Sequence, residues 1–206
     1  MEWIRVLPLC DPGEPNYPVA PYQGWFPILE EVDVPMAIRD QVERLASDLS
    51  DSSVQAFYRF LWLLNRGAEH KTTHAYLLFP VRTIDRTRGA YCFRSEVLLF
   101  PFQVEGSGLR DDLGTVVAMI RSLERRFRFG GNGPDNRTSS VALSAIKLRV
   151  GVKPESRFGF AGRIVVDAYG DSKATAVRDW RSAIEVLVRT LEEQSPPNGI
   201  TADRIV

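Results

Sequence analysis

Cysteine and histidine are scarce in this chain, with two of each among 206 residues. Cys10 and Cys92 are too few for a disulfide framework or a Cys-rich zinc site. His70 and His74 lie four residues apart, but the segment between them looks like the approach to a strand. Glu69 precedes His70, so the His-Glu-x-x-His zinc motif is absent. We therefore expect no metal site and no cofactor.

Long apolar runs are also lacking. The longest lies at residues 57–64 and is interrupted by Arg59, which is far short of the roughly 20 apolar residues that a membrane-spanning helix needs. Glu2 stands where a signal peptide would carry positive charge. We therefore expect no signal peptide and no membrane span, and at most a peripheral contact with a membrane.

Motifs of the common catalytic sites are absent as well. The chain has no Gly-x-Ser-x-Gly nucleophile elbow, and the glycine-rich loop at residues 130–134 lacks the Gly-Lys-Ser/Thr ending of a phosphate-binding loop. Cys92 is expected to be a small buried apolar residue. We expect a protein that binds or assembles rather than an enzyme. A small-ligand enzyme with a pocket around His74, Cys92 or Asp111 is the less favoured alternative.

What the chain does contain is typical of one folded domain. Apolar residues make up 44% and charged residues 25% of the sequence, which are ordinary values for a globular protein. Composition divides the chain into a Pro/aromatic leader at residues 1–35, a single domain at 36–194 and a flexible tail at 195–206.

The leader is rich in proline, which removes a backbone donor and holds the preceding residue extended. We expect an extended leader that either straps across the domain or is exposed as a peptide ligand. In the second case a partner would contact Tyr17, Pro18, Pro21 and Tyr22.

Helical periodicity appears in four segments. The first begins near residue 36 and has an apolar stripe on one side. The second begins at Ser50 or Asp51 and is apolar on most sides. We expect this second helix to be buried between other elements, with an exposed partner groove as the alternative. A third helix begins near Asp111, and Ser172 caps a fourth.

Three segments have the residue content and alternation of β-strands: residues 72–83, 90–104 and 158–169. The first two flank a polar, glycine-containing turn, which predicts an antiparallel hairpin. Pro80 and Pro101 indicate sheet edges or bulges, because proline cannot donate to a strand ladder. Residues 141–152 are apolar without a clear period, so helix and strand both stay open. The order of elements predicts an α+β fold with an antiparallel sheet packed with helices.

Charge is balanced overall but uneven along the chain. Residues 1–55 carry ten acidic and three basic residues, a net −7, whereas residues 119–163 carry ten basic and three acidic residues, a net +7. In the third helix Arg121, Arg125 and Arg128 are spaced by four and three, so their side chains project together. Such a face attracts anionic lipid or phosphate. A solvated face that balances the acidic N-terminal part is the alternative.

The basic residues that we single out as candidates for binding an anionic surface are Arg121, Arg125, Arg128, Lys147 and Arg149. No known nucleic-acid motif accompanies them, and the chain has no net charge, so we do not expect direct sequence-specific binding of nucleic acid.

Four stretches follow one another in a suggestive order. A Pro/aromatic peptide at residues 16–22 is followed by the strand segment 91–97, by the third helix with the apolar segment 141–148, and by residues 162–165 leading to Ala176 and Trp180. In this order, and in length, the chain resembles rhabdovirus matrix proteins. It lacks that family's Lys-rich N-terminus and its Pro-Pro-x-Tyr and Pro-Thr-Ala-Pro motifs.

The resemblance implies a small non-enzymatic structural protein that self-associates beneath a viral envelope. Such a protein binds the anionic membrane and the viral nucleocapsid or nucleoprotein and supports virion assembly and budding. The resemblance implies that the membrane or the nucleocapsid is bound by Arg121, Arg125, Arg128, Lys147 and Arg149, and that the leader binds a neighbouring subunit or a host budding factor. It would be located in the virion, in the host cytoplasm and at the inner face of the host membrane. A cytoplasmic adaptor domain with no membrane role, using the helix around Phe57 to Trp62 as its groove, is the alternative.

Overall fold

The computed structural model describes residues 3–7, 18–19, 51–66, 70–82, 88–101, 113–129, 138–150 and 157–194. In chain order its elements are β1 (Ile4–Val6), β2 (Pro18–Val19), α2 (Asp51–Arg66), β3 (His70–Arg82), β4 (Tyr91–Pro101), α3 (Leu113–Phe129), β5 (Ser139–Val150), β6 (Arg157–Gly170) and α4 (Lys173–Glu193). The fold is α+β, as the sequence predicts. The helix expected near residue 36, the loop at residues 130–136 and the tail lie outside the described residues.

The sheet is mixed rather than purely antiparallel. Its strand order is β1-β5-β6-β4-β3, and β2 also pairs with β5. The four long strands are antiparallel, while β1 and β2 run parallel to β5, at Val141–Leu143 and at Arg149–Val150 respectively. The continuous register of β5 with β6 also answers the question left open for residues 141–152, since this segment is a strand through Val150.

The antiparallel pairing of β3 with β4 is confirmed, and so is the prediction that Pro80 and Pro101 mark a sheet edge or a bulge. Strand β3 is the last strand on its side of the described sheet. Its register with β4 shifts between Leu78 and Val81, the interval that contains Pro80. Pro101 is the final residue of β4. At both positions the missing backbone N–H of proline therefore interrupts no regular hydrogen-bonding between central strands of the sheet.

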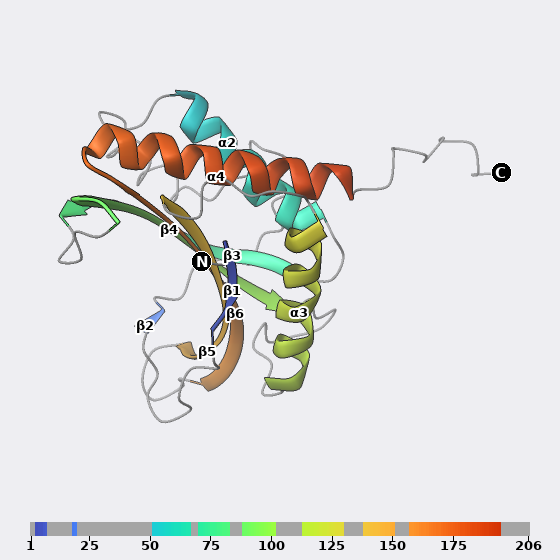
Figure 1. Cartoon of the computed structure of the whole chain (residues 1–206). Coiled ribbons are helices and arrows are strands. Elements are labelled where there is room, and N and C mark those ends of the chain that lie inside the picture. The colour runs from blue at the N-terminus through green and yellow to red at the C-terminus, as the bar shows by residue number, and fades with distance from the viewer. Residues whose placement is uncertain are drawn as a thin grey trace.

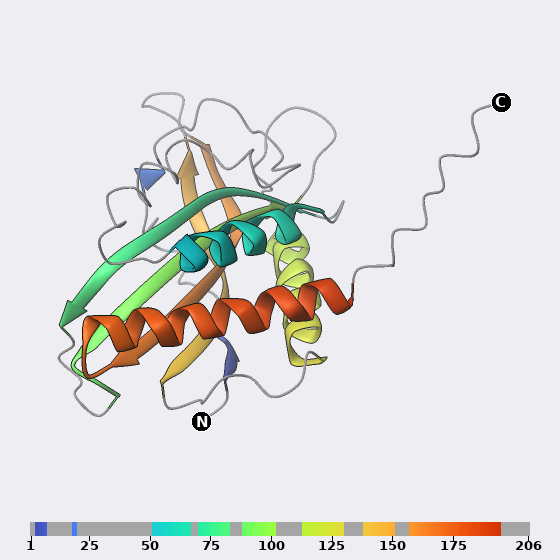
Figure 2. The same cartoon turned by 90° about the horizontal axis from the view of Figure 1, so that it is seen from above.

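Helices α2, α3 and α4 cover the same face of the sheet (Figures 1 and 2). One continuous core joins apolar side chains of all three helices to those on alternate positions of β4, β5 and β6. Helix α2 buries Phe57, Phe60, Leu61 and Leu64, but Tyr58 and Trp62 are only partly buried. The expectation of a buried second helix therefore holds for one side of α2 and not for its whole circumference.

Helix α4 begins as the sequence predicts. The Ser172 hydroxyl accepts a hydrogen bond from the backbone N–H of Thr175 at 3.1 Å, which satisfies one of the free donors of the first turn. Ala176, Trp180, Ile184, Leu187 and Leu191 are buried along one side. This spacing of three and four residues aligns the helix with the sheet beneath it.

Candidate functional site

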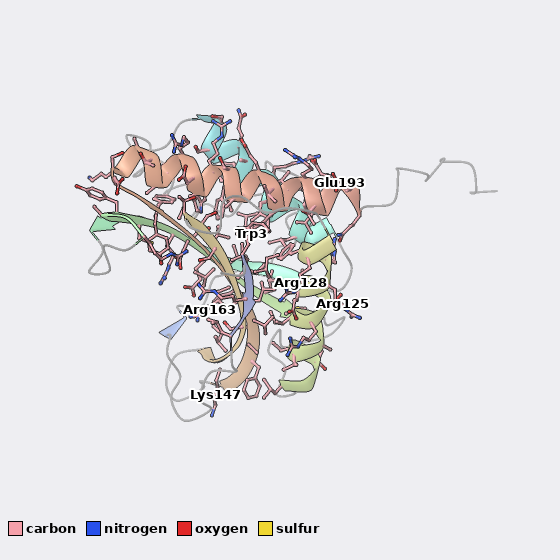
Figure 3. The ribbon with its side chains drawn as sticks, in the orientation of Figure 1. Trp3, Arg125, Arg128, Lys147, Arg163 and Glu193 are labelled. Atoms are coloured by element: carbon pink, nitrogen blue, oxygen red, sulfur yellow. The ribbon has the colours of Figure 1, made fainter. Side chains whose placement is uncertain are left out.

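The first candidate site is the exposed side of α3. Arg121, Arg125 and Arg128 are all exposed there, as their spacing predicts. We call these three residues the α3 arginine face. The first and last of them are separated by seven residue steps, which corresponds to about 10 Å along the helix axis. Figure 3 labels Arg125 and Arg128 on α3.

Close contact with the sheet fixes which side of α3 faces outward. Val116, Ile120, Leu123 and Phe127 are buried in the core. At Gly162 of β6 a Cβ atom would lie 2.6 Å from Cε of Met119 and 2.8 Å from Cδ1 of Ile120, so the helix approaches the sheet at a residue without a side chain. The arginines, on the opposite side of the helix, are therefore held toward solvent.

Glu124 connects two of the three arginines. Its carboxylate accepts a hydrogen bond from Nη1 of Arg121 at 2.8 Å, and others from Nε and Nη2 of Arg128 at 3.1 and 3.0 Å. These hydrogen bonds, with Arg121 the largest contributor, lower the pKa of Glu124 below its ordinary value. Helix α3 contains four arginines and this one acidic residue, which leaves it a net charge of +3.

The remaining basic residues of this segment do not join the α3 arginine face. Figure 3 shows Lys147 at the lower end of the sheet, away from Arg125 and Arg128, and Arg163 on the side of the sheet that faces away from α3. Arg149 is paired through its backbone with Pro18, and nothing is described of its side chain. The basic stretch of the sequence is thus divided among several surfaces of the fold.

Part of the leader belongs to the sheet. Pro18 forms β2 with Val19 on the edge of β5, and Leu7 N donates to Leu143 O at 2.8 Å beyond β1. Trp3 and Ile4 are buried in the core, with Trp3 beneath α4 in Figure 3. Tyr17, Pro21 and Tyr22 lie outside the described residues.

A second group of polar residues lies on the sheet face opposite the helices. It comprises Cys92, Arg94, Glu96, Arg163, Asp167 and Tyr169, which we call the polar sheet face. Arg94 Nε donates to Oδ1 of Asp167 at 2.6 Å and Arg94 Nη2 to Oδ2 at 3.0 Å, a two-point ion pair between β4 and β6. Arg163 Nε donates to Ser144 Oγ at 3.2 Å.

Burial changes the proton affinities of this group. It raises the pKa of the Cys92 thiol to about 11, with the negative charge of Asp167 adding to the effect. Burial likewise raises the pKa of Glu96, opposed by the positive charges of Arg163 and Arg94. Cys92 is buried, as expected, but its sulfur lies 3.9 Å from Oδ1 of Asp167 rather than in the apolar core. A thiol with this pKa is protonated at neutral pH and is a poor nucleophile.

The strand register separates Cys92 from His74. His74 pairs with Leu98, six residues along β4 from Cys92, a distance of about 20 Å at the rise of a strand. A Cys–His pair between these residues is therefore not formed. Within the described part of the chain no group of three or more His, Cys, Asp or Glu side chains is placed to hold a metal ion.

Sequence reasoning missed Arg94, Glu96 and Asp167 as a group. Their alternate positions in two predicted strands were a usable signal, because such residues share one face of a sheet. What the sequence did not supply is the register that sets Arg94 against Asp167. The register can be assigned only once β6 is known to be the neighbour of β4, and Asp167 follows Arg94 by 73 residues.

Comparison with family models, with curated proteins and with solved structures finds no match to this chain. Among the described helices, none combines the length and the apolar content required to cross a membrane.

Proposed function

We propose that this protein is a non-enzymatic assembly protein of the viral matrix type. In this proposal it binds an anionic surface through the α3 arginine face, associates with copies of itself, and supports virion assembly and budding. The membrane and the nucleocapsid are the surfaces concerned. The resemblance in the order of elements suggested this role, and the placement of the arginines supports it.

The observation that carries the proposal is the joint exposure of Arg121, Arg125 and Arg128 on a helix whose other side is fixed in the core. A rigid row of guanidinium groups suits phosphate, because each group offers several N–H donors in one plane. Each basic group near an anionic membrane contributes about 1 kcal/mol. Salt should weaken the binding, because the charges are exposed to solvent.

The test is co-sedimentation of the purified protein with anionic and neutral vesicles at low and high salt. The variant R121Q/R125Q/R128Q removes the charge of the α3 arginine face and keeps long helix-forming side chains. A matched control, K173Q/R178Q/R189Q, removes the same number of charges from exposed positions of α4. Both variants should keep the wild-type circular dichroism spectrum.

We expect salt-sensitive binding to anionic vesicles alone. The α3 variant should lower the binding constant on the order of 100-fold, which is about 1 kcal/mol for each of its three charges. The α4 variant should bind nearly as well as the wild type. An equal loss in both variants would mean that binding depends on total charge rather than on α3. No binding under any condition would remove the proposal.

The second candidate function is an adaptor that docks a protein partner on α2. Arg59 lies over the ring of Trp62, with its guanidinium carbon 4.4 Å from the centroid, and is paired with Glu192 of α4 at 2.9 Å. Half-buried aromatic and arginine side chains of this kind are common in protein interfaces. This function predicts a discrete complex and no binding to vesicles.

A further inference from the structure

Glu124 stands between two of the arginines that the proposed function assigns to the anionic surface. Its side chain is 13% exposed, whereas those of Arg121 and Arg128 are 59% and 40% exposed. The two arginines, one turn before and one turn after it, converge on the same carboxylate from Nη1, Nε and Nη2. Three guanidinium N–H donors that point toward this carboxylate are therefore already engaged within the helix.

We infer that Glu124 is an internal competitor of the anionic surface, which weakens the binding of the α3 arginine face to a phospholipid bilayer. Its carboxylate holds donors of Arg121 and Arg128 that a lipid phosphate would otherwise take, and its charge cancels one of the arginine charges. This inference rests on the proposed function and concerns the same site. It identifies the residue that sets how much anionic lipid is needed for binding.

Two opposing effects of Glu124 have to be compared. By holding Arg121 and Arg128 in place it pre-organises them, but an exposed ion pair of this spacing changes an equilibrium by only about twofold. By cancelling a positive charge next to the membrane it lowers binding by about fivefold. The loss of charge is the larger effect, so the net action of Glu124 is to weaken binding.

The competition does not depend on pH in the neutral and mildly acidic range. Hydrogen bonds from Arg121 and Arg128 lower the pKa of Glu124, so its carboxylate stays ionised there. The phosphate groups of a bilayer must therefore compete with an ionised Glu124 for the N–H donors of Arg121 and Arg128. Binding should begin above a threshold mole fraction of anionic lipid and rise steeply beyond it.

The experiment titrates vesicles of phosphatidylcholine that contain increasing mole fractions of phosphatidylserine. Wild type is compared with E124Q, which keeps the size and one acceptor oxygen of Glu124 but removes the charge. The matched control is E185Q on α4, where Glu185 accepts a hydrogen bond from Arg181 at 2.7 Å with the same spacing of four residues but the opposite order along the helix. Both variants change the net charge by +1.

We expect E124Q to bind two- to fivefold more tightly, within the range set by one charge near a membrane of about fivefold, and to begin binding at a lower mole fraction of phosphatidylserine. E185Q should bind within a factor of about 1.5 of wild type, because its charge lies outside the α3 arginine face. Equal gains in the two variants would overturn the inference, because net charge would then explain them.

Unchanged or weaker binding of E124Q would also overturn it. If R121Q/R125Q/R128Q still abolished binding in that case, the proposed function would stand without a competitor. A wild type that binds no vesicle at any mole fraction would remove the proposed function and this inference together.

Discussion

The indole Nε1 of Trp180 donates a hydrogen bond of 2.9 Å to the hydroxyl of Ser95, which lies 85 residues earlier in the chain. Both residues are fully buried. The Trp180 ring also meets Phe93 edge-on, with centroids 4.9 Å apart, and lies 5.6 Å from Phe57. This one side chain therefore joins α4 to β4 and α2. It belongs to the same apolar core as the buried side chains of α3.

Replacing Ser95 by alanine should destabilise the protein by about 1–3 kcal/mol, because the indole N–H of Trp180 would be left buried without a partner. Urea unfolding followed by tryptophan fluorescence measures the change. The matched control is Ser182→Ala at an exposed position of α4, for which we expect a change within about 0.5 kcal/mol. Equal effects of the two substitutions would contradict the assigned role of the Ser95 hydroxyl.

Replacing Asp167 by asparagine should break the two-point pair with Arg94. The Asp167 side chain is 12% exposed and that of Arg94 43% exposed, so the freed guanidinium can still reach water. For this reason we expect a loss of about 1–2 kcal/mol, in the lower part of the range for hydrogen bonds to charged groups. A shift of the urea midpoint at unchanged slope measures it. A loss no larger than that of an exposed control, Asp171→Asn, would show that the pair contributes nothing.

Glu96 should make stability depend on pH in the direction opposite to most carboxylates. Burial raises its pKa in the folded protein above the ordinary value of 4.5, so its contribution is fully present below that value and is lost as pH rises through the raised pKa. The variant E96Q should therefore unfold at a higher urea concentration than wild type at neutral pH. The difference should disappear below about pH 4, where Glu96 is protonated in both the folded and unfolded states.

Glu124 provides the contrast. Its pKa is lowered in the folded protein, first by the hydrogen bond from Arg121, so its contribution is present above the ordinary value and is lost as pH falls through the lowered pKa. The variant E124Q should lose no more than about 0.5 kcal/mol of stability at neutral pH, since the pairs are exposed. If E96Q and E124Q shifted stability in the same direction, the burial of Glu96 would not be the cause.

The Cys92 thiol should react slowly. With a pKa of about 11, the thiolate fraction at pH 7 is on the order of 10⁻⁴. In a Cys10→Ser variant, which leaves Cys92 as the single cysteine, alkylation by iodoacetamide should be slow at neutral pH and accelerate up to and beyond pH 9. Unfolded protein in denaturant is the control and should react rapidly. Fast labelling of the folded variant would place Cys92 in a different environment.

Local signals in the sequence predicted much of this fold. The period of the apolar residues gave α2, α3 and α4 their positions, and the Ser172 hydroxyl caps α4 because the first turn of any helix has free N–H groups. Pro80 and Pro101 indicated a bulge and a strand end for the same local reason, a missing donor. Residues 141–152 were ambiguous because an apolar strand buried on both faces has no period that distinguishes it from a buried helix.

The charged residues show where local signals end. The sequence by itself determined that Arg121, Arg125 and Arg128 share one side of a helix, because helical spacing is a property of neighbours in the chain. Only the tertiary structure decided that Arg163 lies on the far side of the sheet from them, and that Arg94 meets Asp167. Pairing of β4 with β6 depends on contacts among residues far apart in sequence, and no local pattern encodes that register.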